Sequence, residues 1–501
     1  MIAYVLLTCV FLLIVQILLW VTKEGRLWNK IPGPTPLPFV GNLLPLIGST
    51  EHLWNALHDL AIKYYPIVRI WHTKTVMVLI SHPDDLQVIL SSKANINKPP
   101  LYDLIKPWLG DSVILSKDNK WTERRKILIP AFHLNILKKF IKVTNEHNER
   151  FITFIQSFGD ESVQNVSTLL PELTLKIFCE SAMGVNQNDD LIKKYKHAME
   201  EMFGVSIYRA TRPFIKDWMM PFVKIGQIQK RAVETLHGFR DQMILERRKY
   251  HESTGYQIYQ PVDNESNSSN EIQYKRTLSM IDLLFTLEKE GLIDEDGINE
   301  EVDTFIVGGH DTTAIASTFF LVLLAENVYA QDRARAEITE VLANNNGDIT
   351  SQLHKLHYLE RCIKESIRLY PSAPCIGRIL TEDIQLKNYL LPAGTEVLCM
   401  LRAAHLDPNF WPEPNKFDPD RFLPENVKDR HPFAYSPFSQ GPRNCIGQKL
   451  AFLQIKILAS GILSNFYLEP VDRTVDVKFR MNANLHTTKP LHVKFVKIRK
   501  D

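Results

Sequence analysis

The sequence predicts a mainly α-helical protein with small β-sheets, built as one large domain behind an N-terminal membrane helix. Long amphipathic helical patterns fill most of residues 135–250, and strand-like pieces are short, near residues 66–80, 384–400 and 475–496. Hydrophobic residues make up 45% and charged residues 23%, as in an ordinary globular protein. The formal net charge of +2 provides no overall field that would favour nucleic acid.

Residues 2–21 form the first element, an apolar run long enough to cross a bilayer as a helix. A cleaved signal peptide is the alternative, but no basic segment precedes the run and no small-residue cleavage site follows it. Lys23, Arg26 and Lys30 come next, and the positive-inside rule then places the rest of the chain on the cytosolic side. We therefore expect a retained, single-pass anchor over residues 1–22.

A basic and proline-rich hinge over residues 23–42 follows the anchor. Four prolines between residues 32 and 38 favour a stiff, extended path. We expect a rigid spacer that leads into one domain over residues 43–501. A polar stretch at residues 251–270, rich in Ser, Asn and Gln, predicts a surface loop inside that domain.

A second apolar stretch, residues 305–325, resembles another membrane span in its composition. His310 and Asp311 lie near its middle, where hydrocarbon would penalise them, so we expect an interior helix. Two glycines and a hydroxyl side chain beside them weaken the backbone ladder, which allows a kink or an inserted water. Asp311 and Thr312, an acid followed by an alcohol, can act as a proton-transfer pair. The alternative is a helix whose polar residues pair with a neighbouring helix.

Cys445 differs from the five other cysteines because it lies in a Gly-rich turn, residues 438–447, just before a periodic helical run. No two cysteines are spaced for a zinc knuckle or a CxxC redox pair. A helix amino end lowers the pKa of a thiol and favours the metal-binding thiolate. Arg443 offers a forked cation for a carboxylate, and Gly441 and Gly447 allow close approach of a flat ligand. The alternative is a turn with a buried structural cysteine.

Residues 438–447 match the pattern FxxGxRxCxG and resemble the haem-binding loop of the cytochromes P-450. The resemblance implies the mostly helical, single-domain cytochrome P-450 fold with haem b as cofactor. It makes Cys445 the axial thiolate ligand of the haem iron. It also assigns haem-binding roles to four other residues of the turn, Phe438, Gly441, Arg443 and Gly447.

Two further motifs support the same resemblance. Glu365 and Arg368 lie three apart in a helical stretch and share one face. In the family, such a pair forms a buried charged triad with an arginine that matches Arg421, and the triad supports the haem loop. Trp121 and Arg125 resemble a WxxxR motif that contacts a haem propionate.

Arg378 and Arg443 fit the propionate-binding role as well, because the two carboxylates of a buried haem need several cations. Any one of these arginines, taken alone, is more often a solvated surface charge. The run Gly-Gly-x-Asp-Thr at residues 308–312 resembles the family's oxygen-activating helix, which crosses the haem opposite the thiolate. By that resemblance Asp311 and Thr312 deliver protons to iron-bound oxygen, and His310 is structural.

Several stretches resemble the microsomal fatty-acid hydroxylase branch called family four, namely residues 120–133, 309–313 and 438–449. This implies a haem-thiolate monooxygenase that inserts one oxygen atom of O2 into an unactivated C–H bond of a lipophilic substrate. The substrate would be a fatty acid or a similar long-chain lipid, hormone or xenobiotic. That branch often has a glutamate where this chain has Gly308, and that glutamate can esterify the haem. We therefore expect non-covalent haem and looser selectivity for the terminal carbon.

The resemblance also implies an endoplasmic reticulum membrane location and electrons from NADPH-cytochrome P-450 reductase, with cytochrome b5 as a second candidate partner. A basic cluster is a candidate docking surface for such an acidic partner, with a solvated helix face as the alternative. The cluster comprises Arg124, Arg125, Lys126, Lys138, Lys139 and Lys142. Two other functions stay open: a P-450 that only rearranges peroxides, which would not need Asp311 and Thr312, and a non-enzymatic membrane haem-binding protein.

Overall fold

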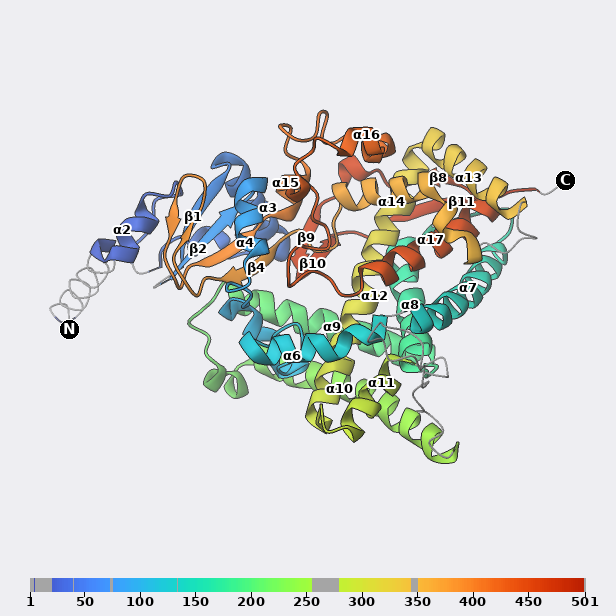
Figure 1. Ribbon diagram of the computed structural model, residues 1–501, viewed down its shortest axis with the longest axis horizontal. Coiled ribbons are helices and arrows are strands. Elements are labelled where there is room, and N and C mark those ends of the chain that lie inside the picture. Colours follow the sequence, from blue (N-terminus) through green and yellow to red (C-terminus); the bar gives the residue numbers. More distant parts are fainter. Residues whose placement is uncertain are drawn as a thin grey trace, which may run out of the picture.

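The computed structural model describes residues 4, 20–38, 40–72, 75–132, 134–254, 279–343 and 350–499. Most of the predicted anchor and most of the predicted polar loop lie outside these residues. The described part is mainly helical with small sheets, so this prediction of fold class is confirmed. A four-stranded sheet lies at one end of the molecule and a three-stranded sheet at the other, with the long helices between them (Figure 1).

Helices make up most of the described chain. Those before residue 160 are α2 (Lys23–Asn29), α3 (Thr50–Lys63), α4 (Pro83–Ser91), α5 (Lys106–Leu109), α6 (Asp118–Leu128) and α7 (Leu134–Gln156). The middle of the chain holds α8 (Val166–Phe178), α9 (Asp189–Ala210), α10 (Lys224–Ser253), α11 (Met280–Lys289), α12 (Glu295–Glu326), α13 (Val328–Ala343) and α14 (His357–Leu369). The last are α15 (Leu401–His405), α16 (Pro424–Val427) and α17 (Gln448–Asn465).

Single short turns of helix connect several of these elements. They are η1 (Leu44–Leu46), η2 (Pro100–Ile105), η3 (Ile129–Phe132), η4 (Cys179–Met183), η5 (Asp217–Phe222), η6 (Thr350–Lys355), η7 (Pro419–Phe422), η8 (Pro432–Ala434) and η9 (Thr474–Asp476). Of these, η4 is a π turn that continues α8, and the others are 3₁₀ turns.

The four-stranded sheet has the order β1-β2-β7-β4, so β1 is an edge strand. Its strands are β1 (Ile67–His72), β2 (Thr75–Ile80), β7 (Glu396–Cys399) and β4 (Ile376–Ile379). β1 and β2 form an antiparallel pair, β2 runs parallel to β7, and β4 returns antiparallel to β7. The sheet thereby brings the segment after α14 beside the N-terminal part of the chain.

The remaining strands form three small sheets. The three-stranded sheet has the order β3-β11-β8, with β3 (Glu161–Asn165), β11 (His492–Lys497) and β8 (Phe466–Pro470). The two hairpins are β9 (Phe479–Asn482) with β10 (Asn484–Thr487), and β5 (Ile384–Gln385) with β6 (Leu390–Leu391). Strands occur in all three predicted regions, whereas β3, β4 and β8 were not predicted.

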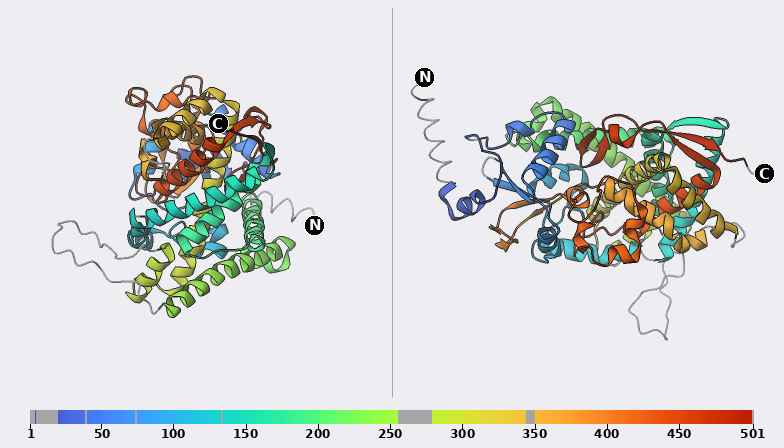
Figure 2. Two further views of the ribbon diagram at one scale, coloured as in Figure 1. Left: turned by 90° about the vertical axis from the view of Figure 1, so that its right-hand side faces the viewer. Right: turned by 90° about the horizontal axis from the view of Figure 1, so that it is seen from above.

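Helix α12 passes through the middle of the helical part, as the two views of Figure 2 and the labels of Figure 1 show. It packs against α8, α10, α14 and α17. In the described part of the chain it is the one helix long and apolar enough to cross a membrane, yet 83% of its apolar window is buried. The predicted interior helix at residues 305–325 is therefore confirmed.

The proline-rich hinge packs along the free edge of β1. Arg69 N–H donates to the Pro32 carbonyl at 2.8 Å, and Asn42 N–H donates to the Trp71 carbonyl at 2.8 Å. A Cβ on Gly33 would lie 2.3 Å from the Arg69 carbonyl oxygen, so only glycine permits this approach. The hinge thus covers an exposed sheet edge and forms part of the folded unit from α2 onward.

Candidate functional site

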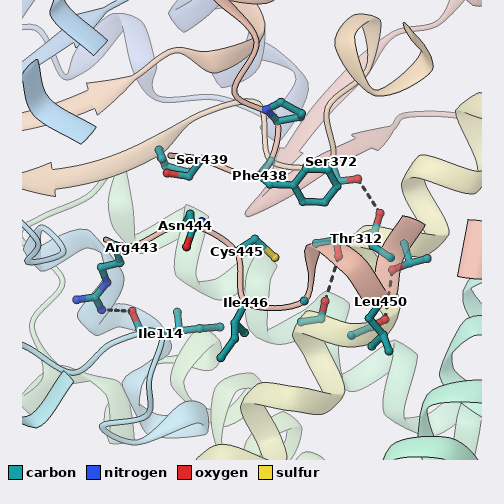
Figure 3. Close-up of a pocket in the computed structure, with 18 of the residues that line it drawn as sticks. Ile114, Thr312, Ser372, Phe438, Ser439, Arg443, Asn444, Cys445, Ile446 and Leu450 are labelled. Carbon is teal, nitrogen blue, oxygen red and sulfur yellow. Dashed lines mark hydrogen bonds between the residues drawn. The ribbon is translucent and has the colours of Figure 1, made fainter. Parts of the chain in front are cut away.

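A deep cavity of about 310 Å³ lies between α12 and the turn that precedes α17 (Figure 3). Most of its wall is apolar, and no Asp or Glu of the described chain contributes to it. Apolar side chains reach it from α8, α12, α14 and α17 and from the segments between helices. They include Ile114, Phe132, Phe178, Phe305, Ile367, Ile376 and Leu450. The cavity therefore suits a large apolar ligand.

The Cys445 side chain faces this cavity from a turn that a backbone hydrogen bond closes. The Cys445 N–H donates to the Phe438 carbonyl at 2.9 Å, which closes the turn. Gly441 has φ +74°, and a Cβ there would lie 2.0 Å from the Leu90 carbonyl oxygen at the end of α4. Gly441 therefore locks the turn onto α4 and does not itself line the cavity. In Figure 3 the Cys445 side chain lies between Arg443 on one side and Thr312 on the other.

The Cys445 side chain faces the cavity and is exposed within it, although protein atoms surround it on the other sides. Burial raises its pKa, although the Gly447 N–H at the start of α17 and the nearby Arg125 act to lower it. The sequence-based expectation of a lowered thiol pKa is therefore wrong for the polypeptide itself, because desolvation outweighs the Gly447 N–H and Arg125. A coordinated cation would have to stabilise the thiolate.

Four cations reach the same cavity. They are Lys98, Arg125, Arg378 and Arg443. Arg443 donates to the carbonyl oxygens of Ile114 and Ser116 at 2.8 and 2.9 Å, as Figure 3 shows for Ile114. Trp121 contacts both Arg125 and Arg443, whose guanidinium carbons are 5.7 and 5.0 Å from its ring centroid. Within the described residues none of the four has a carboxylate within salt-bridge distance.

Burial and mutual repulsion lower the pKa values of two of these four cations. Burial, with Arg378 and Arg125 nearby, lowers the pKa of Arg443 to about 9. Burial, Arg378 and Arg443 hold the pKa of Lys98 well below its ordinary value. Buried cations without counter-ions are unfavourable, so the site is built for an anionic group. A haem, with one iron position for a thiolate and two carboxylates on one edge, fits this arrangement of Cys445 and the cations.

The predicted charged triad is formed in the structure. Arg368 donates from Nε to Glu365 Oε2 at 2.7 Å, and Arg421 Nε lies 3.3 Å from Glu365 Oε1. The side chains of Glu365 and Arg368 are fully buried. The Glu365 carboxylate also accepts the Asp418 N–H at 3.0 Å, which ties α14 to the segment before η7. The triad does not line the cavity, but α14, which carries two of its members, contributes Ile367 to the cavity wall.

Thr312 reaches the cavity wall on α12, opposite Cys445. Its Oγ1 donates to the Gly308 carbonyl at 3.0 Å, and its own carbonyl accepts the Ser372 hydroxyl at 2.6 Å. The helix is continuous from residue 295 to residue 326, so the hydroxyl satisfies a backbone carbonyl without breaking the helix. The glycines therefore do not interrupt the helix.

Asp311 does not line the cavity, although its neighbour Thr312 does. Its Oδ2 accepts the Asn484 side-chain N–H at 2.6 Å and lies 3.4 Å from His486 Nε2. Burial would raise the pKa of this carboxyl, but His486 and Asn484 outweigh burial and bring it to about 2. His310, predicted to be structural, is fully buried and packs edge-on against Tyr195 at 5.8 Å between ring centroids.

Some of the predicted site residues line the cavity and others do not. Trp121, Arg125, Arg378, Phe438, Arg443, Cys445, Gly447 and Thr312 line the cavity, whereas Gly441, Asp311 and the triad do not. Sequence reasoning missed Lys98, because a lone lysine before two prolines carries no motif. It also missed Ser372 and His486, which reach α12 only through the folding of distant segments.

The predicted basic cluster is not one surface. Arg124 is 10% exposed and lies 3.8 Å from both Glu300 and Glu301, and Arg125 faces the cavity. Burial lowers the pKa of Lys139. Only the outer lysines, Lys126, Lys138 and Lys142, remain exposed.

Comparison with known proteins finds relatives over most of the chain. The family model described as Cytochrome P450 matches residues 31–495. The chain is 34% identical to cytochrome P450 4c3 of Drosophila melanogaster over 475 residues, 93% of this chain and 89% of that protein. It is 33% identical to cytochrome P450 4V2 of Homo sapiens over 474 residues, 91% of this chain and 88% of the relative. It is 33% identical to cytochrome P450 4d2 of Drosophila melanogaster over 492 residues, which are 95% of this chain and 96% of that protein.

Proposed function

This chain belongs to the cytochrome P450 family and is a haem monooxygenase, and on that premise we propose that it hydroxylates long-chain lipids with electrons from NADPH. The proposal depends most on one observation: Cys445 opens into an apolar cavity whose polar edge holds four cations without carboxylate partners among the described residues. A thiolate ligand, an apolar wall and an anion-binding edge suit haem better than a lone metal ion. The described residues hold no cluster of three or more His, Cys, Asp or Glu side chains for a metal.

We assign the haem contacts residue by residue. Cys445 would hold the iron, and Arg125, Arg378, Arg443 and Lys98 would hold the propionates, with Trp121 in contact with two of these cations. Haem b, when bound, supplies the activation of O2 for insertion into a C–H bond. The protein's own part is to exclude water with apolar side chains and to bring protons from the α12 side.

The wall of the cavity supports a lipophilic substrate. Phe132, Phe178 and Phe305 lie around the side of the cavity that faces α12, and Phe132 packs edge-on against Phe305 at 5.9 Å. Since the chain lacks a side chain at Gly308, the space beside α12 is open. We propose a fatty acid or a similar long-chain lipid that is hydroxylated at or near its terminal carbon.

We propose an endoplasmic reticulum location with the folded domain on the cytosolic face, held by an anchor over residues 1–22. Three exposed aromatic side chains support contact with a membrane: Phe214, Trp218 and Phe222 are 64%, 71% and 82% exposed around η5. NADPH-cytochrome P-450 reductase would supply electrons, with cytochrome b5 as a second donor. Deleting residues 1–19 should weaken flotation with phosphatidylcholine vesicles while the chain still binds haem.

The test of the proposed function is spectroscopic first and catalytic second. The reduced protein should give the CO difference band of a thiolate-ligated haem, and Cys445→Ala should lose it. Cys362→Ala is the control: it makes the same substitution at a cysteine that is buried in α14 and does not line the cavity. A Cys445→Ala protein that keeps the thiolate band would refute the ligand assignment.

The substrate is tested with purified reductase and a series of saturated fatty acids of increasing length. Addition of a substrate should shift the haem spectrum, and NADPH consumption should yield a hydroxylated product. Turnover of lipid hydroperoxides without NADPH, and no turnover with it, would instead establish the peroxide-rearranging alternative.

A further inference from the structure

A contact between α12 and the β9–β10 hairpin gives Asp311 a partner from the far end of the chain. The Asp311 carboxylate points away from the cavity, toward Asn484 and His486 on β10. His486 Nε2 and Asp311 Oδ2 lie 3.4 Å apart, which is within ion-pair distance but without the alignment of a hydrogen bond, so a small movement of the imidazole must precede proton transfer. Asp311 precedes Thr312, whose hydroxyl lines the cavity. A proton on the Asp311 carboxyl is therefore one residue along α12 from the cavity wall.

The side chains along this contact become steadily more exposed from the interior to the surface. The exposed fraction rises from 2% at Asp311 to 17% at His486. Arg480 is paired with His486 across the hairpin and is 35% exposed, and Glu200, 3.9 Å from Arg480, is 50% exposed. His486 therefore lies between a buried carboxylate and a solvated ion pair.

The charges around the pair favour a protonated imidazole. Burial and Arg480 act to lower the pKa of His486, but Asp311 outweighs them, with a smaller contribution from Glu200, so this pKa is raised from its ordinary value. Asp311 also faces His310 on its own helix, and the pKa of its carboxyl is about 2. Of the two groups, the imidazole therefore holds a proton more strongly than the carboxyl, which is ionised.

We propose that His486 supplies the protons that Asp311 passes toward Thr312 during turnover. This inference rests on the proposed monooxygenase function. In the step, the Nε2–H bond of His486 breaks and an O–H bond forms at Asp311 Oδ2. The acid then turns about its Cα–Cβ bond and releases the proton on the Thr312 side, while His486 takes a proton from solvent. Monooxygenation consumes two protons and two electrons per O2, and the reductase supplies the electrons, so the cycle balances.

The first test needs no turnover. Full-length protein in detergent is labelled with ¹³C at histidine Cε1 and titrated by NMR, and His486→Gln identifies the resonance. The pKa of His486 should lie above 6.5, and Asp311→Asn should lower it by about one pH unit, because a neighbouring carboxylate favours the charged imidazole. A pKa that does not respond to Asp311→Asn would overturn the proposal.

The second test measures product and peroxide per NADPH with reductase and a substrate that shifts the haem spectrum. His486→Gln should reduce product per NADPH by about tenfold, since a lost proton-transfer group is only partly replaced by water. His486→Arg keeps a cation beside Asp311 but cannot release a proton at neutral pH, so it should be equally uncoupled. Both variants should keep the CO band and the substrate-induced shift.

The pH profile separates proton supply from simple positioning. Since His486 is protonated below its raised pKa, coupling in the native protein should fall as the pH rises through that pKa, and the two variants should lack this step. His492→Gln is the matched control, because His492 also contacts an aspartate, Asp472, at 2.8 Å but on β11. Full coupling in His486→Arg would show that only the positive charge matters and would overturn the proposal. A native protein that forms no product from any lipid would refute the proposed function and leave the NMR result standing.

Discussion

Arg368 and Glu365 form a two-point ion pair inside the protein: Nε donates to Oε2 at 2.7 Å and Nη2 donates to Oε1 at 2.8 Å. Both side chains are fully buried, and their spacing of three residues puts them on one face of α14. Arg368 also donates to the His405 carbonyl at 2.8 Å. His405 Nε2 in turn accepts the Ser436 N–H at 2.9 Å, two residues before Phe438. The pair thus fixes α14 to the turn that carries Cys445.

Removing one partner of this pair should be strongly destabilising. Arg368→Leu leaves the Glu365 carboxylate buried with Arg421 and the Asp418 N–H beside it, and we expect a loss of about 3–5 kcal/mol in the free energy of unfolding. Denaturant unfolding, with haem content measured at each point, checks this. Lys364→Met on the same helix is the control, because Lys364 pairs with Glu360 at the surface and should cost no more than about 1 kcal/mol. Equal losses in both variants would contradict the structural role of the triad.

Lys98 should have opposite effects on the polypeptide and on haem binding. Burial and two neighbouring arginines hold its pKa well below the ordinary value, so Lys98→Met should stabilise the haem-free chain. If Lys98 contacts a propionate, the same change should weaken haem binding by about tenfold, the loss of one charge-assisted hydrogen bond. Haem transfer to apomyoglobin measures the affinity, and Lys93→Met, at an exposed position nearby, is the control. Unchanged haem affinity would remove Lys98 from the site.

Thr312→Ala should keep haem and substrate binding but divert NADPH into peroxide. The Thr312 hydroxyl lies on α12 across the cavity from Cys445, beside two other cavity-lining threonines, Thr304 and Thr313, and its loss removes a proton donor at the cavity wall. Thr312→Ser should restore most of the coupling, and Thr313→Ala, whose hydroxyl lies 3.4 Å from the Gly309 carbonyl, is the matched control. Product per NADPH that does not change in Thr312→Ala would make Thr312 a packing residue.

The parts of the site that sequence reasoning predicted are those that local patterns determine. Cys445 before a helix, the spacing of Glu365 and Arg368, and a polar interruption in an apolar helix can all be read within about ten residues. Lys98 and His486 could not be found in this way, because each depends on segments more than a hundred residues away. The direction of the Asp311 side chain was likewise set by β10, which α12 meets only in the folded protein.

The shift of the Cys445 pKa shows why a local argument can give the wrong sign. The Gly447 N–H at the start of α17 and Arg125 lower the thiol pKa as expected, but desolvation exceeds both. The short strands β3, β4 and β8 were missed for a related reason: pairing with distant partners, rather than residue preference, makes them strands.

Gly309 should not tolerate a side chain, in contrast to Gly308. A Cβ on Gly309 would lie 2.0 Å from Phe178 Cε2, where α8 packs against α12, whereas a Cβ on Gly308 would meet nothing within 4 Å. We expect Gly309→Ala to cost about 1–3 kcal/mol through overpacking and Gly308→Ala to cost much less. Thermal unfolding of the two variants checks this, and Phe178→Leu should partly rescue Gly309→Ala. Equal stability of both glycine variants would contradict the packing of α8 on α12.

The haem of this protein should be bound without a covalent link. An ester requires a carboxylate beside a haem methyl, and no Asp or Glu of the described residues lines the cavity. The two nearest acids on α12 are engaged elsewhere: Asp303 Oδ2 accepts from Arg240 at 2.7 Å, and Asp311 faces β10. Acidified organic solvent should therefore extract all the haem, and denaturing mass spectrometry should give the mass of the bare polypeptide. A chain that retains the mass of haem would show that another acid reaches the cofactor.

Gly308→Glu tests the reason for this expectation. Gly308 lines the cavity, and a Cβ there would meet no atom within 4 Å, so a glutamate would project toward the cofactor without displacing the protein. After turnover with NADPH and reductase, we expect part of the haem in Gly308→Glu to resist extraction, and hydroxylation to concentrate on the terminal carbon because the pocket is narrower. Gly308→Gln is the matched control: it fills the same space but lacks the carboxylate, so it should narrow the product range without retaining haem. Haem that is fully extractable from Gly308→Glu would mean that position 308 does not face a haem methyl, and the assignment of α12 relative to the cofactor would need revision.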